Sequence, residues 1–300
     1  MINSRHLNGN PILSDPAHTA LYLYGVVPSV GTDGEPLVLT ARGLDGASVN
    51  VVTYRDVGIL MHACAPLPYQ GDVEHIHAWV LAHHEVVSAA HSAAGTILPM
   101  RFNSIAAAAD RPVADILVDW LDRSHDVLAA RLAVLRDRVE LGVQVLAERT
   151  PRDPSAGPGA ATANSTSRGR GYFQEQLAER QEKERLRAAE ALTARTVFDE
   201  LAAHCDEIVV NSKRPILQDS SGTGTKQTVV PVLLDAALLA HSDKVGAIGR
   251  YLADVAAAPG LTVRFTGPWA PYTFSGAFDM PLLIPATSDP ATDKEAHNDA

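Results

Sequence analysis

The spacing of apolar residues in the first half of the chain predicts strands first and then helices. Residues 21–27 are apolar almost throughout and precede a proline, which is typical of a strand buried on both faces. Residues 37–39 indicate a second, shorter strand. Two further apolar runs, residues 49–54 and 57–64, flank Arg55-Asp56, and this spacing predicts a β-hairpin with a two-residue turn.

Apolar residues then recur every three or four positions, which predicts two helices. Asp72 is placed to cap the first helix, which should stop at Gly95. The apolar residues of this helix fall on one broad arc that should face a sheet: Val73, Ile76, Trp79, Val80, Val86, Val87 and Ala90. A second helix should begin at Asp110-Arg111-Pro112 and could continue to about Val139.

Two apolar segments accompany these helices. Residues 97–102 contain Pro99, which favours an irregular or edge strand. Residues 143–146 predict a strand that closes the first domain, with Gly142 at the junction. The order of strand, hairpin, helix, irregular strand, helix and strand indicates an α+β fold. We expect a largely antiparallel sheet with helices packed on one face, similar to a ferredoxin-like domain with additions.

The second half of the chain also mixes helices and strands. Residues 171–204 follow a helical pattern, but residues 179–185 are polar on every side, which predicts a long helix that is partly solvated. The apolar residues at its two ends should dock: Tyr172, Phe173, Leu177, Leu192, Val197, Phe198 and Leu201. The other expected elements are strands at residues 207–210, 229–234 and 261–265 and a helix at residues 243–258.

These elements divide the chain into two α+β domains. The expected order is a mobile tail at residues 1–18, an N-terminal domain at 19–149, a linker at 150–168, a C-terminal domain with the long helix at 169–284, and a disordered acidic tail at 285–300. A chain of 300 residues is long enough to bury a core in each domain.

Charge and composition restrict the classes of partner. The chain carries 35 acidic and 25 basic residues, a formal net charge of −10. A generally basic surface for nucleic acid or for an anionic membrane is therefore not expected. The sequence has no apolar run of the ~18 residues that span a bilayer, and its polar first residues lack a signal-peptide core. Two cysteines make no disulfide framework, so we expect a soluble cytoplasmic protein.

Histidines gather on the first predicted helix, but not at spacings that bind a metal. His77, His84 and His91 are seven residues apart, about 10 Å along a helix axis, whereas a zinc site on one helix needs ligands four residues apart. Ser88 stands where an H-E-x-x-H motif would place its second histidine after His84. The sequence also contains no nucleophile elbow and no phosphate-binding loop. We therefore expect no metal, no cofactor and no catalytic residues.

The most distinctive segment, residues 266–274, contains two prolines and three aromatic residues. Proline fixes φ at about −65° and lacks the backbone N–H that donates hydrogen bonds, so this segment is neither a helix interior nor a central strand. Aromatic side chains on a stiff backbone need apolar surface to lie against. Two interpretations remain open, namely a strap that closes the last strand onto the core and an aromatic contact presented to a partner.

The same segment resembles a known family signature. Gly267-Pro268-Trp269-Ala270-Pro271-Tyr272-Thr273-Phe274 is similar to the C-terminal G-P-W-P-P-Y-x-F signature of the gas vesicle protein F/L family (GvpF/GvpL). Three shorter segments agree with this family in order and spacing, namely residues 22–27, 98–102 and 169–173. Two positions depart from the family pattern: Ala270 replaces a second proline, and Asn103 replaces the glycine that commonly follows the L-P-x-R-F segment.

Members of this family are accessory proteins of gas vesicles, whose walls are built chiefly from a small hydrophobic shell protein. The resemblance implies a non-enzymatic role in gas vesicle assembly, in which the chain binds the shell protein or other accessory proteins and could stay in the shell as a minor component. The residues expected to bind these partners are Trp269, Pro271, Tyr272, Phe274, Arg101 and Phe102. Two alternatives remain open: an enzyme or small-ligand-binding protein with a site between the domains, and a scaffold that uses the charged helix at residues 175–187.

Overall fold

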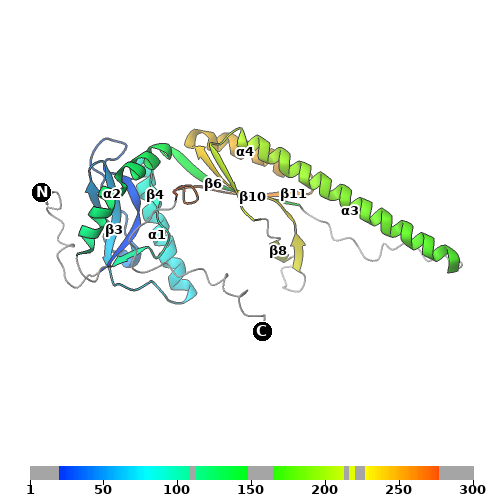
Figure 1. Cartoon of the computed structure of the whole chain (residues 1–300), viewed down its shortest axis with the longest axis horizontal. Coiled ribbons are helices and arrows are strands. Elements are labelled where there is room, and N and C mark those ends of the chain that lie inside the picture. The colour runs from blue at the N-terminus through cyan, green and yellow to red at the C-terminus, as the bar shows by residue number, and fades with distance from the viewer. Residues whose placement is uncertain (1–19, 108–111, 148–164, 213–215, 220–226, 277–300) are drawn as a thin grey trace. The chain divides into compact units, whose positions relative to one another are not determined.

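The computed structural model describes residues 20–107, 112–147, 165–212, 216–219 and 227–276 (Figure 1). The chain folds as two compact units. Unit 1 contains the residues up to Glu140 and from Trp269 onward, and unit 2 contains Leu141–Pro268. The tails predicted at residues 1–18 and 285–300 and most of the predicted linker lie outside the described residues.

Unit 1 contains a five-stranded sheet in the order β2-β3-β1-β4, in which β5 also pairs with β1. The strands are β1 (Ala20–Pro28), β2 (Asn50–Tyr54), β3 (Val57–Cys64), β4 (Leu98–Pro99) and β5 (Ile105–Ala107). β1 is antiparallel to β3, β4 and β5, and β2 is antiparallel to β3. The predicted hairpin is confirmed, since Tyr54 pairs with Val57 and Arg55 adopts a left-handed φ of 55° in the turn.

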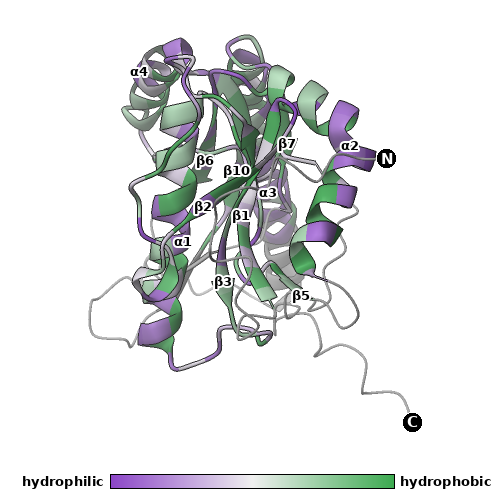
Figure 2. Cartoon of the chain, turned by 90° about the vertical axis from the view of Figure 1, so that its left-hand side faces the viewer, coloured by the Kyte–Doolittle hydropathy of each residue, from purple (hydrophilic) through white to green (hydrophobic). Residues whose placement is uncertain are grey.

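The helices α1 (Val73–Ala94) and α2 (Val113–Val134) lie on opposite sides of this sheet (Figure 2), rather than on one face as expected. The reason lies in β1, which is buried at all nine of its positions. Tyr22 and Tyr24 share a core cluster with the C-terminal half of α1, whereas α2 contacts β1, β2 and β3. A strand without a polar face needs cover on both sides.

The predicted caps of α1 are confirmed, but its predicted inward arc is wrong in the first half of the helix. The Asp72 carboxylate accepts a hydrogen bond from the backbone N–H of His75 at 2.9 Å, and Gly95 ends the helix with a φ of 70°. Val86, Val87 and Ala90 are buried as expected. In contrast, Val73 is 84% exposed and Val80 is 42% exposed. The apolar pattern of α1 therefore continues beyond the part that packs in the core.

Unit 2 contains a four-stranded sheet in the order β11-β6-β10-β7 and a two-stranded ribbon of β8 and β9. Its elements are β6 (Arg138–Ala147), α3 (Ser165–Ala202), β7 (Glu207–Val210), β8 (Ile216–Asp219), β9 (Gln227–Val230), β10 (Val232–His241), α4 (Val245–Ala256) and β11 (Leu261–Trp269). β10 is antiparallel to β7, and α3 packs on β10. The predicted α+β class is confirmed in both units.

The predicted extent of the second helix was wrong at its C-terminal end. α2 stops at Val134, and residues from Arg138 belong to β6, where Val139, Leu141, Val143 and Val145 are buried at alternate positions. Val139 therefore belongs to a strand pattern of period two and does not extend α2. Gly142 lies inside this strand, where an added Cβ would stand 2.5 Å from the hydroxyl oxygen of Thr266.

Three shorter predictions also differ from the structure. Residues 37–39 form no strand, since their only neighbouring pairing is an isolated bridge between Val30 and Pro36. The single strand expected at residues 229–234 is divided at Pro231 into β9 and β10, because proline cannot donate a ladder hydrogen bond. The strand expected at residues 261–265 continues to Trp269.

The long helix α3 is solvated in its middle, as predicted. Lys183 Nζ lies 3.4 Å from Glu179 Oε1, and Arg180 Nε lies 3.4 Å from Glu184 Oε1, on an exposed helix surface. Of the residues expected to dock, Val197 and Leu201 are buried, but Leu177 and Leu192 are exposed. Among the members of this set whose burial is described, those nearest the C-terminal end of α3 therefore pack, and the side chains of Tyr172 and Phe173 lie outside the described residues.

Candidate functional site

The aromatic segment predicted from the sequence begins in the edge strand β11 and returns to unit 1. An edge position tolerates Pro268, which lacks a backbone N–H. After Trp269 the chain leaves the strand, and residues 269–275 lie against α2 and the first residues of β6. We call residues 269–275 the strap.

Side chains from two elements hold the strap in place. The Thr273 backbone N–H and hydroxyl both donate to the Glu140 carboxylate, each at 2.7 Å. Arg131 Nε donates to the Phe274 carbonyl oxygen at 2.9 Å, and Arg131 Nη2 donates to the same oxygen. The Ser275 hydroxyl donates to the Tyr272 carbonyl oxygen at 3.0 Å. The bonds to Glu140 and from Arg131 involve a charged group and tie the strap to β6 and α2.

The strap residues fall into buried and accessible sets. Phe274 and Ala270 are each 2% exposed, and Pro271 is also buried. Ala270 belongs to the core cluster that contains Tyr22 and Tyr24, so the alanine that replaces the family's second proline fills a packed position. In this conformation Pro271 and Phe274 serve as anchors, and Trp269 remains 41% exposed.

A groove of about 320 Å³ lies beside the exposed side of the strap. It is lined by His84, Glu140, Trp269 and Tyr272, and we call it the ring groove. The His84 ring meets the Trp269 ring edge to face, with centroids 4.9 Å apart, and stacks on Tyr272 at 6.4 Å. Burial raises the pKa of the Tyr272 hydroxyl well above its usual range, so this ring stays neutral. Three rings and one carboxylate suit an apolar group with a neighbouring positive charge.

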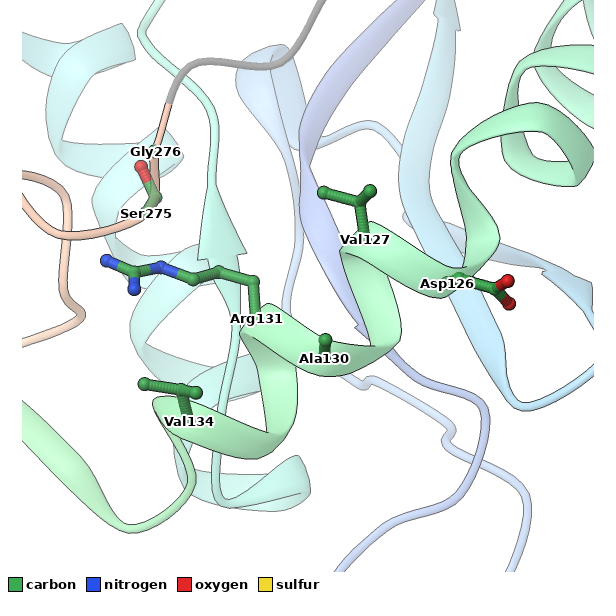
Figure 3. A pocket seen from close by; sticks show the side chains of 7 residues that line it. All are labelled: Asp126, Val127, Ala130, Arg131, Val134, Ser275 and Gly276. Atoms are coloured by element: carbon green, nitrogen blue, oxygen red, sulfur yellow. The ribbon is translucent and has the colours of Figure 1, made fainter.

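A second hollow of about 500 Å³ lies at the other end of the strap, beside α2. Its lining residues are Asp126, Val127, Ala130, Arg131, Val134, Ser275 and Gly276 (Figure 3). Figure 3 shows the Arg131 side chain extending from α2 toward Ser275 and Gly276. Because Arg131 is already bound to the strap, the open part of this hollow is formed by exposed valines.

Arg101 and Phe102, the other residues expected to bind a partner, do not line the ring groove. Arg101 is exposed, whereas Phe102 is half-buried, with its ring centroid 6.4 Å from that of Tyr22 and 6.3 Å from that of His83. Phe102 and Tyr272 nevertheless pack against the same core cluster. The structure thus joins Phe102 to the strap only through that shared core.

Asn103, the residue after Phe102, departs from the family pattern, and the structure shows how the turn accommodates it. Asn103 adopts a φ of 66°, a left-handed conformation that glycine takes freely and that asparagine tolerates better than most residues. Its side chain accepts a hydrogen bond from the Tyr69 N–H at 2.9 Å and donates to the Tyr69 carbonyl at 3.1 Å. The asparagine thus keeps the turn and adds two hydrogen bonds to it.

Beneath this turn lies a buried polar network that sequence reasoning missed. Tyr22 bonds to His83 Nδ1 at 2.9 Å, and His83 Nε2 donates to the Met100 carbonyl at 3.1 Å. Tyr24 bonds to His62 Nδ1 at 2.9 Å. Burial lowers the pKa of each histidine to about 4, so both rings are neutral at pH 7. No local spacing signals this network, because its members come from separate elements.

Two classes of site are not found in the part of the chain that the structure describes. None of its helices is both long enough and apolar enough to cross a membrane. No cluster of three or more His, Cys, Asp or Glu side chains among the described residues is placed to hold a metal ion.

Comparison with known proteins finds relatives that match most of this chain. The family model described as "Gas vesicle synthesis protein GvpL/GvpF" matches residues 20–276. Gas vesicle protein L1 of Halobacterium salinarum is 28% identical over 260 residues, which cover 85% of this chain and 89% of that protein. Gas vesicle protein L of a Streptomyces species is 33% identical over 194 residues, or 64% of this chain and 67% of that protein.

Solved structures support the same assignment at the level of the fold. The crystal structure of the gas vesicle protein GvpF from an Anabaena species aligns with a TM-score of 0.58 at 19% identity, covering 86% of this chain and 99% of that one. GvpF from Microcystis aeruginosa aligns with a TM-score of 0.57. None of these relatives is named as an enzyme, in line with the prediction that this chain is not one. The chain belongs to the gas vesicle synthesis protein GvpL/GvpF family.

Proposed function

We propose that this protein is a non-enzymatic accessory protein of gas vesicle assembly, which binds the small apolar shell protein in the cytoplasm through the ring groove. The observation that carries this proposal is Trp269, a large ring that is 41% exposed although its neighbours in the strap are anchored. Tryptophan held on a rigid backbone loses little conformational entropy on binding and is frequent among residues that dominate interfaces.

The properties of a small apolar shell protein fit a partner that is held in solution by this chain. A small apolar subunit exposes strand edges and apolar surface before it is assembled, and such surface aggregates in water. A larger protein that covers this surface for a time keeps the subunit available for ordered addition. The net charge of −10 on this chain would help to keep the complex dissolved.

We propose a set of contact residues that differs in part from the one expected from the sequence. Trp269 and Tyr272 line the groove directly, and His84 and Glu140 join them although the sequence did not indicate either. Pro271 and Phe274 are buried and do not line the groove, so we propose them as anchors of the strap rather than as contacts. Exposed Arg101 remains a proposed second contact, which could pair with a partner's carboxylate.

Co-expression with the shell protein, followed by size-exclusion chromatography of the soluble fraction, tests the proposal. We expect shell protein to be insoluble alone and to co-elute with this chain. Trp269→Ala should abolish co-elution without unfolding the chain, because Trp269 is already 41% exposed to solvent. Phe265→Ala is the matched control, since Phe265 is a similarly exposed aromatic residue of β11 outside the groove. Shell protein that pellets with or without this chain would contradict the proposal.

A second function is favoured by the charged surface of α3, which fits a scaffold for other accessory proteins. The ion pairs Glu179–Lys183, Arg180–Glu184 and Arg195–Asp199 lie along this helix and are exposed. Binding through such charges should weaken strongly between low and physiological salt. Binding through the ring groove should persist in part at high salt and be lost in Trp269→Ala, and this pair of results separates the two functions.

A further inference from the structure

An uncovered apolar stripe runs along the first half of α1. Val73, Ile76, Val80 and Leu81 are all exposed, although each is a large aliphatic residue. The spacing of Val73, Ile76 and Val80 places them on one side of the helix, beside the face that enters the core. We call these four residues the α1 stripe. Exposed aliphatic residues are common singly, but a continuous row of them indicates an interaction surface.

The α1 stripe leads directly to the ring groove. His84 follows Val80 by four residues and so lies on the same side of α1, one turn further along. The His84 ring is the one that contacts Trp269 and Tyr272. From Val73 to His84 the surface extends for about 16 Å, or three helical turns. All of these residues belong to unit 1, so the surface is complete within one compact unit.

The charges around this surface indicate the chemistry of its occupant. α1 contains two glutamates, Glu74 and Glu85, and no lysine or arginine. At 100° per residue both glutamates lie on the side of the helix next to Leu81. Glu140 adds a carboxylate at the ring groove. An occupant with basic residues along one edge would complement this acidic border.

We infer that the α1 stripe and the ring groove together bind one amphipathic helix of the partner, about three turns long, with an apolar face and a lysine- or arginine-rich edge. This inference rests on the proposed function and specifies the part of the partner that is recognised. A helix is favoured over a strand because the surface is a helix face with rows at three- and four-residue spacing, into which side chains of a second helix interdigitate. A strand would need an unpaired sheet edge instead, and α1 offers none.

A designed peptide tests this inference without depending on the identity of the partner. The probe is a fluorescein-labelled 14-residue peptide with leucines along one helical face and lysines along one edge. Two companions carry glutamates in place of the lysines or the same residues in scrambled order. Fluorescence anisotropy titrations with the full chain at low salt should show that the lysine-edged peptide binds at least about tenfold more tightly than either companion.

Variants of α1 then locate the binding surface. Ile76→Gln together with Val80→Gln should weaken binding of the lysine-edged peptide by about tenfold, because glutamine keeps the helix but removes the apolar contact. Ser92→Gln is the matched control, since Ser92 is an exposed residue of the same helix about two turns beyond His84, and it should leave the affinity unchanged. Circular dichroism should show the same thermal midpoint for all three proteins.

The outcomes separate this inference from the proposed function. If shell protein co-elutes normally with the Ile76→Gln/Val80→Gln chain, the inference is overturned and the proposed function stands. If shell protein fails to co-elute with the unaltered chain, the proposed function fails, and the peptide titrations still decide the inference. Equal binding of all three peptides, or self-association of the chain that the double variant abolishes, would overturn the helix as the occupant.

Discussion

The helices α1 and α3 both leave a long surface uncovered, yet the chemistry of the two surfaces is opposite. The exposed half of α1 carries valine, isoleucine and leucine. The exposed middle of α3 carries ion pairs between residues four apart. Water solvates a charged helix face at no cost, whereas apolar surface gains about 25 cal/mol for each Å² removed from water. An uncovered apolar surface therefore suggests a partner more strongly than an uncovered charged one.

The largest change in the free energy of unfolding should come from lowering the pH, which acts on buried histidines such as His83 in α1. Burial lowers the pKa of His83 on α1, and of His62 beside it, to about 4. Unfolding returns both pKa values to about 6.5, so the unfolded chain binds more protons between these values. The free energy of unfolding should be fully retained above about pH 6.5 and fall as the pH drops toward 4, by an amount on the order of a few kcal/mol.

Urea denaturation at pH 7, 6, 5 and 4.5 measures this dependence. Burial also lowers the pKa of His91, so His91 should add to the loss of stability at low pH. His125 should act in the opposite sense, because its hydrogen bonds to Asp126 and Asp56 raise its pKa. His83→Gln should reduce the slope of stability against pH, because it removes one of the two buried groups whose pKa is lowered. A slope that His83→Gln leaves unchanged would mean that other groups dominate.

Changes of intermediate size in the free energy of unfolding should distinguish the buried half of α1 from its exposed half. Val87 is fully buried, so Val87→Ala should lower the free energy of unfolding by about 2 kcal/mol through lost burial and a residual cavity. Val80→Ala should change it by less than about 0.5 kcal/mol, since that side chain is already partly in water. Chemical denaturation of both variants gives the two values, and equal losses would show that the α1 stripe is covered in solution.

The smallest change in the free energy of unfolding should come from removing an exposed ion pair of α3. Glu184→Gln removes the exposed pair with Arg180 and should lower the free energy of unfolding by only a few tenths of a kcal/mol. Raising the salt concentration should have a similarly small effect on the unaltered chain. Denaturation in low and high salt checks both expectations. A loss of more than about 1 kcal/mol would indicate that this part of α3 is buried against another surface.

Local rules account for the parts of this protein that its sequence predicted well. Asp72 and Gly95 delimit α1 because caps act within one helical turn. The hairpin at Arg55-Asp56 forms because two residues suffice to reverse a strand. The aromatic segment carried the family resemblance because its prolines and aromatic residues stand at characteristic positions in the sequence. Each of these features depends on neighbours that are close along the chain.

Tertiary structure decided the rest, because burial depends on residues that are distant in sequence. The pattern of α1 is apolar along its whole length, and only the packing of the core leaves Val73 and Val80 outside it. Nothing near His84 in the sequence indicates that Trp269, 185 positions later, will lie 4.9 Å from it. The sequence by itself therefore determined the α+β class, the caps and the family, whereas the folded chain alone decided which apolar residues remain exposed and that they lead to one groove.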